Sequence, residues 1–174
     1  GYCVVEGAQL VKNPDEIRLL ECAAQLADIG MTTMLDHLGE GVTEIECSAA
    51  ATQKMMLMGS EDVAYYPLCE SGAHSWNTYK YPTMKRMQNG DMVWMDCGVP
   101  FFCGYTGDIA RTAVVGKPTD LQRKIYSGIY DMLWYATEEL KPGASIDAPV
   151  AAAARAAEKH GMQDWVYFGI LGHG

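Results

Sequence analysis

Two aspartates in apolar surroundings constrain this chain more than any other feature. The stretch from residue 95 to 112 is MDCGVPFFCGYTGDIART, and it holds Asp96 and Asp108, twelve residues apart. Asp96 closes the apolar run of residues 92–95, and Asp108 follows a second apolar and aromatic run, residues 99–105. Two such runs, joined by a turn that contains glycine and proline, predict a hairpin or two adjacent strands, with each aspartate at the end or edge of one strand.

A carboxylate among apolar neighbours is costly unless it is paired with a cation. Arg111 is close enough in sequence to pair with one of the two aspartates. Two converging carboxylates with a single nearby arginine favour a divalent metal ion instead, because such ions take carboxylate oxygens as ligands. The alternative is that Asp96 and Asp108 are turn or cap residues and that Arg111 forms a surface ion pair. The spacing of the two aspartates alone favours neither of these two interpretations.

Capping signals predict two pairs of helices on either side of a region of strands. Asn13 and Pro14 open the first helix, and a capping box that starts at Thr43 opens the second. A third helix begins with a capping box at Thr119, and an alanine-rich helix follows over residues 146–159. The strands are predicted from short apolar runs, at residues 63–66, 92–97 and 164–171.

The order of these elements repeats within the chain. Pro14 and Pro118 open the two copies, 104 residues apart, and Gly41 and Gly143 mark the same joint, 102 residues apart. This duplication predicts two related halves that face each other across a shared site. The second copy lacks its hairpin, so by symmetry the missing hairpin should supply further ligands to complete the aspartate pair.

Composition excludes several classes of protein. A net charge of −9 argues against the basic face that a nucleic-acid-binding protein needs, and no run of 18 apolar residues predicts a membrane span. The six cysteines form no C-x-x-C pair, which indicates reduced residues in a cytoplasmic protein. We expect one partial domain over residues 1–174, a fragment of a longer chain, with its first half at about 12–116 and the start of its second half at about 117–174.

The sequence resembles the pita-bread metallopeptidases (family M24), which include aminopeptidase P, prolidase and creatinase. The resemblance rests on D-x-G at Asp96, on G-Y-x-x-D-I-x-R-T around Asp108, on Asn89-Gly90-Asp91 and on Gly172-His173-Gly174, all in family order. It covers most of the chain, from about residue 12 to 174. It implies an α+β fold of two pseudo-symmetric halves, each with helices over a curved antiparallel sheet, of which the second half is truncated here.

The resemblance also implies a metal centre and a reaction. Asp96, Asp108 and His173 would be ligands of two divalent metal ions, and the mixed oxygen and nitrogen set suits Mn, Co, Zn or Fe. The remaining ligands and the general base are expected beyond residue 174, so no catalytic residue is assigned in this chain. The full-length protein would use a metal-activated water to hydrolyse a small Xaa-Pro peptide, and a homodimer is left open. The fragment itself is expected to be inactive.

Two departures from the peptidase pattern keep other functions open. Tyr79 or Lys80 replaces a histidine that these peptidases carry ahead of the first metal strand, and Gly169 replaces a histidine four residues before His173. These losses favour a non-peptidase of the same fold that acts on a small molecule, like the dimethylsulfoniopropionate lyase or creatinase. A metal-free binding module of the same fold is a further alternative.

Three residues are candidates for substrate binding. Tyr79 and Lys80 could line the pocket, with Lys80 gripping a carboxylate, or they could form a solvated strand edge. His74 could serve the same pocket, although a solvated loop histidine is the commoner reason for its place in the sequence.

Overall fold

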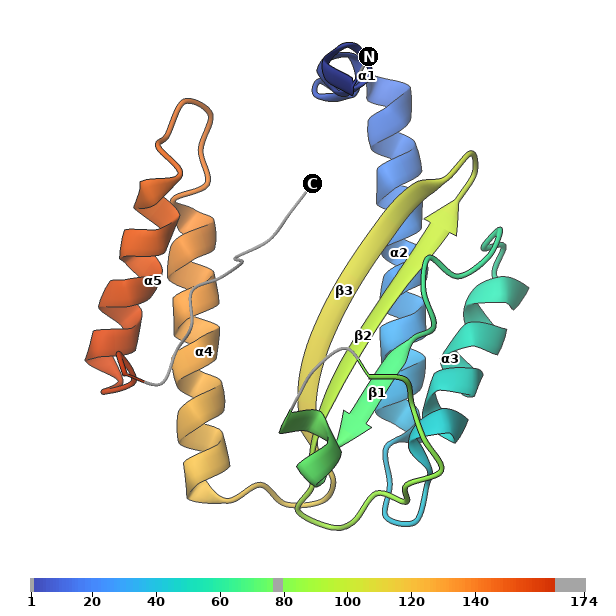
Figure 1. Cartoon of the computed structure of the whole chain (residues 1–174), viewed down its shortest axis with the longest axis vertical. Helices are drawn as coiled ribbons and strands as arrows, with labels where there is room; N and C mark the ends of the chain where they lie inside the picture. The colour runs from blue at the N-terminus through green and yellow to red at the C-terminus, as the bar shows by residue number, and fades with distance from the viewer. Residues whose placement is uncertain (1, 77–79, 165–174) are drawn as a thin grey trace. The chain divides into compact units, whose positions relative to one another are not determined.

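The chain folds into two compact units, residues 1–117 and 118–174, and the computed structural model describes residues 2–76 and 80–164. The first unit contains, in order, α1 (Tyr2–Gln9), α2 (Pro14–His37), α3 (Glu44–Leu57), β1 (Leu68–Ser71), the 3-10 helix η1 (Gly72–Trp76), β2 (Met92–Phe101) and β3 (Tyr105–Val114) (Figure 1). The second unit contains α4 (Asp120–Glu138) and α5 (Asp147–Lys159).

Three helices begin where capping signals predicted, whereas α1 was not predicted and α5 begins at Asp147 without a side-chain cap. The Asn13 side chain accepts hydrogen bonds from the first turn of α2, and the Asn13 N–H donates in turn to the Glu16 carboxylate at 2.7 Å. The same reciprocal capping box begins α3 at Thr43 and α4 at Thr119. Each box satisfies backbone N–H groups that a helix start leaves without partners, which is why these three boundaries can be located from sequence.

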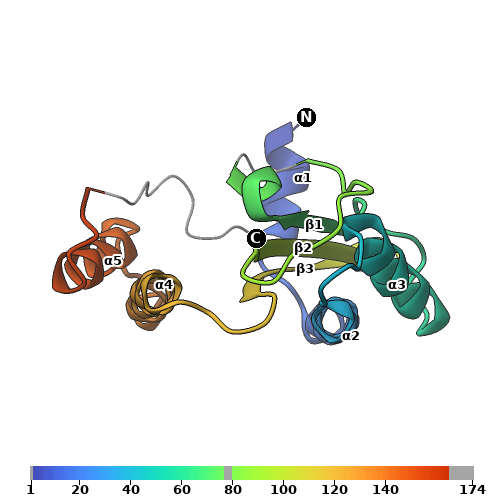
Figure 2. The same ribbon diagram turned by 90° about the horizontal axis from the view of Figure 1, so that it is seen from below.

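The three strands form an antiparallel sheet in the order β1-β2-β3, and α2 and α3 lie on one side of it (Figure 2). Side chains alternate between the two faces of a strand. Four alternate residues of β2 are fully buried in the core between the sheet and these helices, namely Val93, Met95, Cys97 and Val99. The even-numbered residues of β2 therefore lie on the opposite face.

One predicted strand is wrong. Residues 63–66 are not in a strand; the strand is β1, which begins at Leu68. The segment does run beside β2, because the Ala64 N–H donates to the Gly98 carbonyl at 3.1 Å. Pro100 of β2 has no N–H to donate in return, so a regular ladder cannot continue there. The strand predicted at residues 164–171 lies almost wholly outside the described residues.

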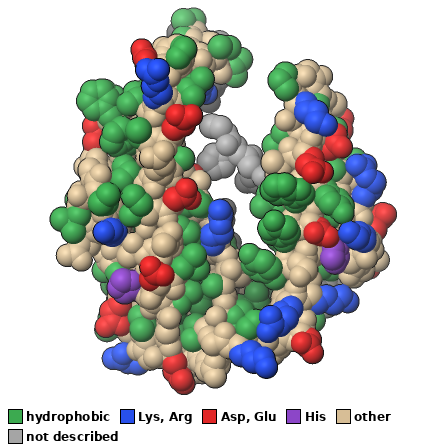
Figure 3. All heavy atoms as spheres, turned by 180° about the vertical axis from the view of Figure 1, so that it is seen from behind, with side chains coloured by type: hydrophobic (Ala, Val, Ile, Leu, Met, Phe, Trp, Pro, Cys, Tyr) green, Lys and Arg blue, Asp and Glu red, His purple; other side chains and the backbone are tan. Residues whose placement is uncertain are grey.

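The second unit is a pair of packed helices. Its core joins the inner faces of α4 and α5 through Met132, Ala136, Ala153, Ala156 and Ala157. Hydrophobic side chains also remain at its surface (Figure 3), among them Leu133 and Trp134, each 54% exposed. None of the helices in the described part of the chain is both long and apolar enough to cross a membrane.

Candidate metal centre

Asp96 and Asp108 meet on the face of the sheet opposite α2 and α3. Asp96 lies inside β2 and Asp108 inside β3, where it pairs with Gly98. The Tyr65 hydroxyl lies 2.6 Å from Asp96 Oδ1 and 2.8 Å from Asp108 Oδ1. The two carboxylates thus converge on one point, as the sequence predicted. They do so from within long strands, whereas the sequence predicted each aspartate at the end or edge of its strand.

Gly98 makes room for Tyr65. A Cβ atom at residue 98 would lie 2.4 Å from Tyr65 Cε1, so the aromatic ring packs directly on the backbone of β2. Sequence analysis missed Tyr65 as a site residue because it is 31 residues from Asp96 and lies in no strand. A glycine inside a strand often marks the close approach of another group, and Gly98 was the available signal.

The Tyr65 phenol stays protonated in this position. Burial raises the pKa of Tyr65 far above its ordinary value, and the hydrogen bonds to Asp96 and Asp108 raise that pKa further. A phenol has one proton and can donate it to one carboxylate at a time. Two carboxylates that converge in this way form a donor set that fits a hard divalent cation.

The aspartates are two of the three metal ligands that the sequence predicted. Within residues 2–76 and 80–164 no group of three or more histidine, cysteine, aspartate or glutamate side chains could hold a metal ion. His173, the third predicted ligand, lies outside the described residues. The structure therefore brings two of the predicted ligands together, and metal binding by them stays a prediction.

Arg111 is directed away from the aspartates. It lies three residues after Asp108 in β3, so strand alternation places the two side chains on opposite faces. The Arg111 guanidinium donates to the Ala110 carbonyl at 2.8 Å. This arrangement favours the metal interpretation of the aspartate pair over the surface ion pair.

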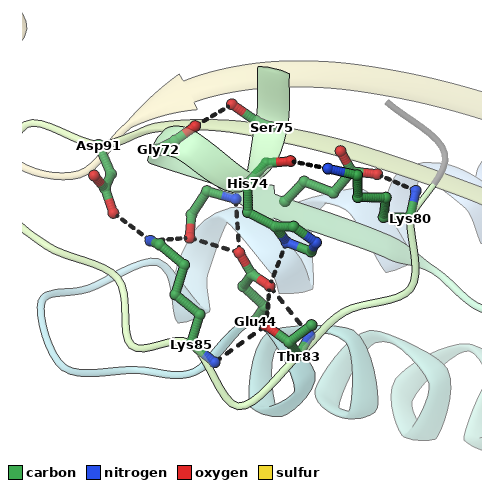
Figure 4. Close-up of polar contacts among 10 residues, drawn as sticks. Glu44, Gly72, His74, Ser75, Lys80, Thr83, Lys85 and Asp91 are labelled. Carbon is green, nitrogen blue, oxygen red and sulfur yellow. Dashed lines mark hydrogen bonds and ion pairs between the residues drawn. The ribbon is translucent and has the colours of Figure 1, made fainter. Parts of the chain in front are cut away.

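Lys80 and His74 are each held by a buried glutamate. The Lys80 backbone N–H donates to Glu70 Oε1 at 2.6 Å, and Lys80 Nζ lies 3.5 Å from the His74 carbonyl (Figure 4). The His74 ring Nδ1 lies 2.9 Å from Glu44 Oε2. Tyr79, the third candidate for substrate binding, lies outside the described residues.

Glu44 organises a polar cluster at the start of α3 (Figure 4). It is 0% exposed and receives the backbone N–H and hydroxyl of Ser71, the backbone N–H and hydroxyl of Thr83, and the contact from His74. Burial alone would raise the pKa of Glu44, but the hydrogen bonds from Thr83 and Ser71 together outweigh it and lower that pKa. Lys85 extends the cluster, because its ammonium contacts the Ser71 hydroxyl at 2.7 Å and Asp91 Oδ2 at 2.8 Å.

Comparison with known proteins identifies the family. A model of metallopeptidase family M24 matches residues 18–174. The chain belongs to this family. Among curated M24 relatives, the Xaa-Pro dipeptidase of Pyrococcus furiosus is 30% identical over 171 residues, which are 98% of this chain and 49% of that protein. The chain therefore spans about half the length of such relatives.

Solved structures confirm the fold. The prolidase from Pyrococcus furiosus superposes with a TM-score of 0.86 at 30% identity, over 93% of this chain and 48% of that one. The Xaa-Pro dipeptidase from Bacillus anthracis gives a TM-score of 0.87 at 29% identity, over 97% of this chain and 46% of that one. These M24 structures share the α+β pita-bread fold that the sequence predicted.

Proposed function

We propose that this chain forms part of a metal-dependent Xaa-Pro dipeptidase that holds two divalent ions through Asp96, Asp108 and His173. The observation that carries the proposal is the convergence of Asp96 and Asp108 on the Tyr65 hydroxyl. The names of the M24 relatives support the substrate class, since they include Xaa-Pro dipeptidases from Pyrococcus furiosus and Lactobacillus helveticus. We expect the remaining ligands and the general base beyond residue 174.

In this proposal, the residues of this chain would hold the metal ions and orient the groups around them. Divalent ions held there would supply an acidified water and polarise the scissile carbonyl. Asp96 and Asp108 would hold them from the rigid hairpin of β2 and β3, which fixes the spacing of the two carboxylates. Tyr65 would orient the carboxylates through its hydroxyl, and Gly98 would leave the space that the ring needs.

Lys80 is our first candidate for contact with the substrate. Glu70 fixes its backbone, while its ammonium makes a single long contact to the His74 carbonyl. A lysine ammonium on a flexible stem can bind the carboxylate of a dipeptide. We keep Tyr79 and His74 as further candidates, although His74 already contacts Glu44.

The cellular compartment and the oligomeric state of this protein are also matters of proposal. Among the cysteines whose side chains the structure describes, Cys22, Cys47, Cys69, Cys97 and Cys103 are free thiols, and free thiols are typical of the reducing cytoplasm. We propose a cytoplasmic protein for that reason. A homodimer is left as a question for sedimentation analysis of the full-length protein.

Metal content and cleavage of Xaa-Pro dipeptides, measured together on the full-length protein, test the proposed function. We expect two divalent ions per chain by elemental analysis and metal-dependent cleavage of Ala-Pro. Asp108→Asn should lower the metal content and abolish cleavage, because a carboxylate ligand is lost without a change of shape. A full-length protein that binds no metal would overturn the proposal and favour the metal-free binding module. The 174-residue chain alone should bind metal weakly and cleave nothing.

A non-peptidase of the same fold is the second candidate. It is favoured by the replacement of two peptidase histidines, by Tyr79 or Lys80 and by Gly169. Under this alternative the protein would bind two metals, fail to cleave any Xaa-Pro dipeptide, and turn over a small molecule such as dimethylsulfoniopropionate or creatine. Cleavage of any Xaa-Pro dipeptide would exclude it.

A further inference from the structure

Glu70 of β1 is a buried carboxylate with one oxygen unused. The residue is 0% exposed, and its Oε1 accepts the Lys80 N–H at 2.6 Å. Its Oε2 is the buried side-chain polar atom that has no hydrogen-bond partner among the residues the structure describes. Buried polar atoms almost always have a partner, so an exception calls for a physical reason.

Register and strand alternation place Glu70 on the same face as the aspartates. Leu68 pairs with Asp96 and Glu70 pairs with Trp94, so these four side chains share one face of the sheet. Cys69 and Ser71 point to the other face, where Cys69 joins the core with α2 and α3. Glu70 therefore lies next to the candidate metal centre, two residues along β1 from the position opposite Asp96.

The lysines near Glu70 in the chain do not satisfy the unused oxygen. Lys80 Nζ contacts the His74 carbonyl, and Lys85 Nζ contacts Asp91 and the Ser71 hydroxyl. None of the ion pairs found in residues 2–76 and 80–164 includes Glu70. A buried carboxylate oxygen without a donor is unfavourable, so a ligand that brings a donor to Oε2 would relieve that cost.

We infer that Glu70 is a specificity residue whose Oε2 accepts a hydrogen bond from a protonated amine of the substrate held at the aspartate site. The inference rests on the proposed function for the identity of the substrate as a peptide. An ammonium group fits because it brings both a donor and a positive charge to a buried carboxylate. Trp94, on the same face and opposite Glu70, adds an aromatic neighbour of the kind that favours cations.

The amine can come from the α-amino group of the peptide or from a basic side chain, and three dipeptides separate these sources. Binding of Lys-Pro, norleucyl-Pro and N-acetyl-norleucyl-Pro is measured by calorimetry on the metal-depleted full-length protein, in which no turnover occurs. If the α-amine is the donor, acetylation should weaken binding about tenfold, the usual scale of one charge-assisted hydrogen bond. If the side chain is the donor, Lys-Pro should bind about tenfold more tightly than norleucyl-Pro.

Glu70→Gln should erase whichever difference the wild type shows. The amide oxygen can still accept the Lys80 N–H, but the second acceptor becomes an NH₂ donor and the charge is lost. Glu138→Gln on the exposed surface of α4 is the matched control and should keep the wild-type difference. Equal binding of all three peptides to the wild type, no binding of any, or a difference that survives Glu70→Gln would each overturn the inference.

The proposed function fails separately from this inference. It depends on metal-dependent cleavage of Ala-Pro, whereas the role of Glu70 depends on peptide binding without metal. A protein that shows the amine preference but no cleavage would retain the Glu70 site and lose the peptidase activity. A protein that cleaves Ala-Pro but shows no amine preference would retain the peptidase activity and lose the proposed role of Glu70.

Discussion

Glu44 and Glu70 are both fully buried glutamates, yet their surroundings differ completely. Glu44 receives five contacts from Ser71, Thr83 and His74, whereas Glu70 receives one, from the Lys80 N–H. A buried carboxylate is costly for the fold to the extent that donors do not satisfy its oxygens. The difference teaches that burial alone does not assign a role: the saturated carboxylate holds the fold together, and the half-used one is open to a ligand.

Strand β1 separates these two roles within adjacent residues. Ser71 donates to Glu44 on the side of α3, while Glu70 lies on the face that carries Asp96. Because the side-chain period of a strand is two, neighbouring residues serve opposite faces. The two glutamates therefore serve opposite faces of the sheet, although His74 and Lys80 link their surroundings through side-chain and backbone contacts.

The largest effect is expected at Glu44. Glu44→Gln places an NH₂ group against hydrogen-bond donors and removes the charge they stabilise, so the free energy of unfolding should fall by about 3 kcal/mol. Urea denaturation at pH 7 measures this loss, with Glu138→Gln on the surface of α4 as control. If the free energy of unfolding falls by less than about 1 kcal/mol, Glu44 does not stabilise the fold more than Glu70 does.

The stabilising effect of Glu44 should also depend on pH. The pKa of Glu44 is lowered in the folded state, so its stabilising contribution is complete above the ordinary carboxyl pKa of about 4.3 and is lost as pH falls through the lower folded value. We expect the stability difference between wild type and Glu44→Gln to shrink between pH 5 and pH 3, by urea denaturation at each pH. A difference that stays constant over this range would show that Glu44 does not act through its charge.

A smaller effect is expected on the face that Glu70 shares with the aspartates. Gly98→Ala would force a Cβ into the Tyr65 ring and should cost about 1–3 kcal/mol through overpacking, and it should also lower metal content in the full-length protein. The double variant with Tyr65→Ala is the informative control, because the ring that the new Cβ meets is gone. If Gly98→Ala costs the same in both backgrounds, the clash with Tyr65 is not its cause.

The smallest effect on stability is expected at Glu70 itself. Glu70→Gln keeps the bond to the Lys80 N–H and removes a half-satisfied buried charge, so the free energy of unfolding should change by less than about 1 kcal/mol and in the stabilising direction. Thermal and urea denaturation beside Glu44→Gln provide the test. Destabilisation as large as that of Glu44→Gln would mean that Glu70 is a structural residue like its counterpart.

Local signals made much of the fold predictable. Asn13, Thr43 and Thr119 each begin a helix as expected, because a capping box is complete within four residues. The strand at residues 63–66 failed because its apolar composition resembles that of a strand, while pairing with β2 is limited by Pro100, far along the chain. Residues 68–71 are buried on both faces, so they show no alternation that would mark β1 as a strand.

The candidate site was predictable only in part. The aspartate pair could be found because both residues lie on one hairpin. Tyr65, Glu44 and Glu70 could not, since their roles depend on partners that the fold brings from distant positions. In the sequence Glu44 follows the capping residue Thr43 and indicates only a helix start, and nothing in the run Cys69-Glu70-Ser71 indicates which residue faces the aspartates.

The short hairpin turn between β2 and β3 also sets an order of events in folding. The turn spans only residues 102–104, so pairing of β2 with β3, the strands that carry Asp96 and Asp108, closes a small loop, and hairpins of this kind form in about 1–10 μs. Glu70 can take its place only when β1 docks onto β2 across a longer separation, which is slower. Pulsed hydrogen exchange during refolding should show amides of β2 and β3 protected before those of β1. Simultaneous protection would mean that the three strands form as one nucleus.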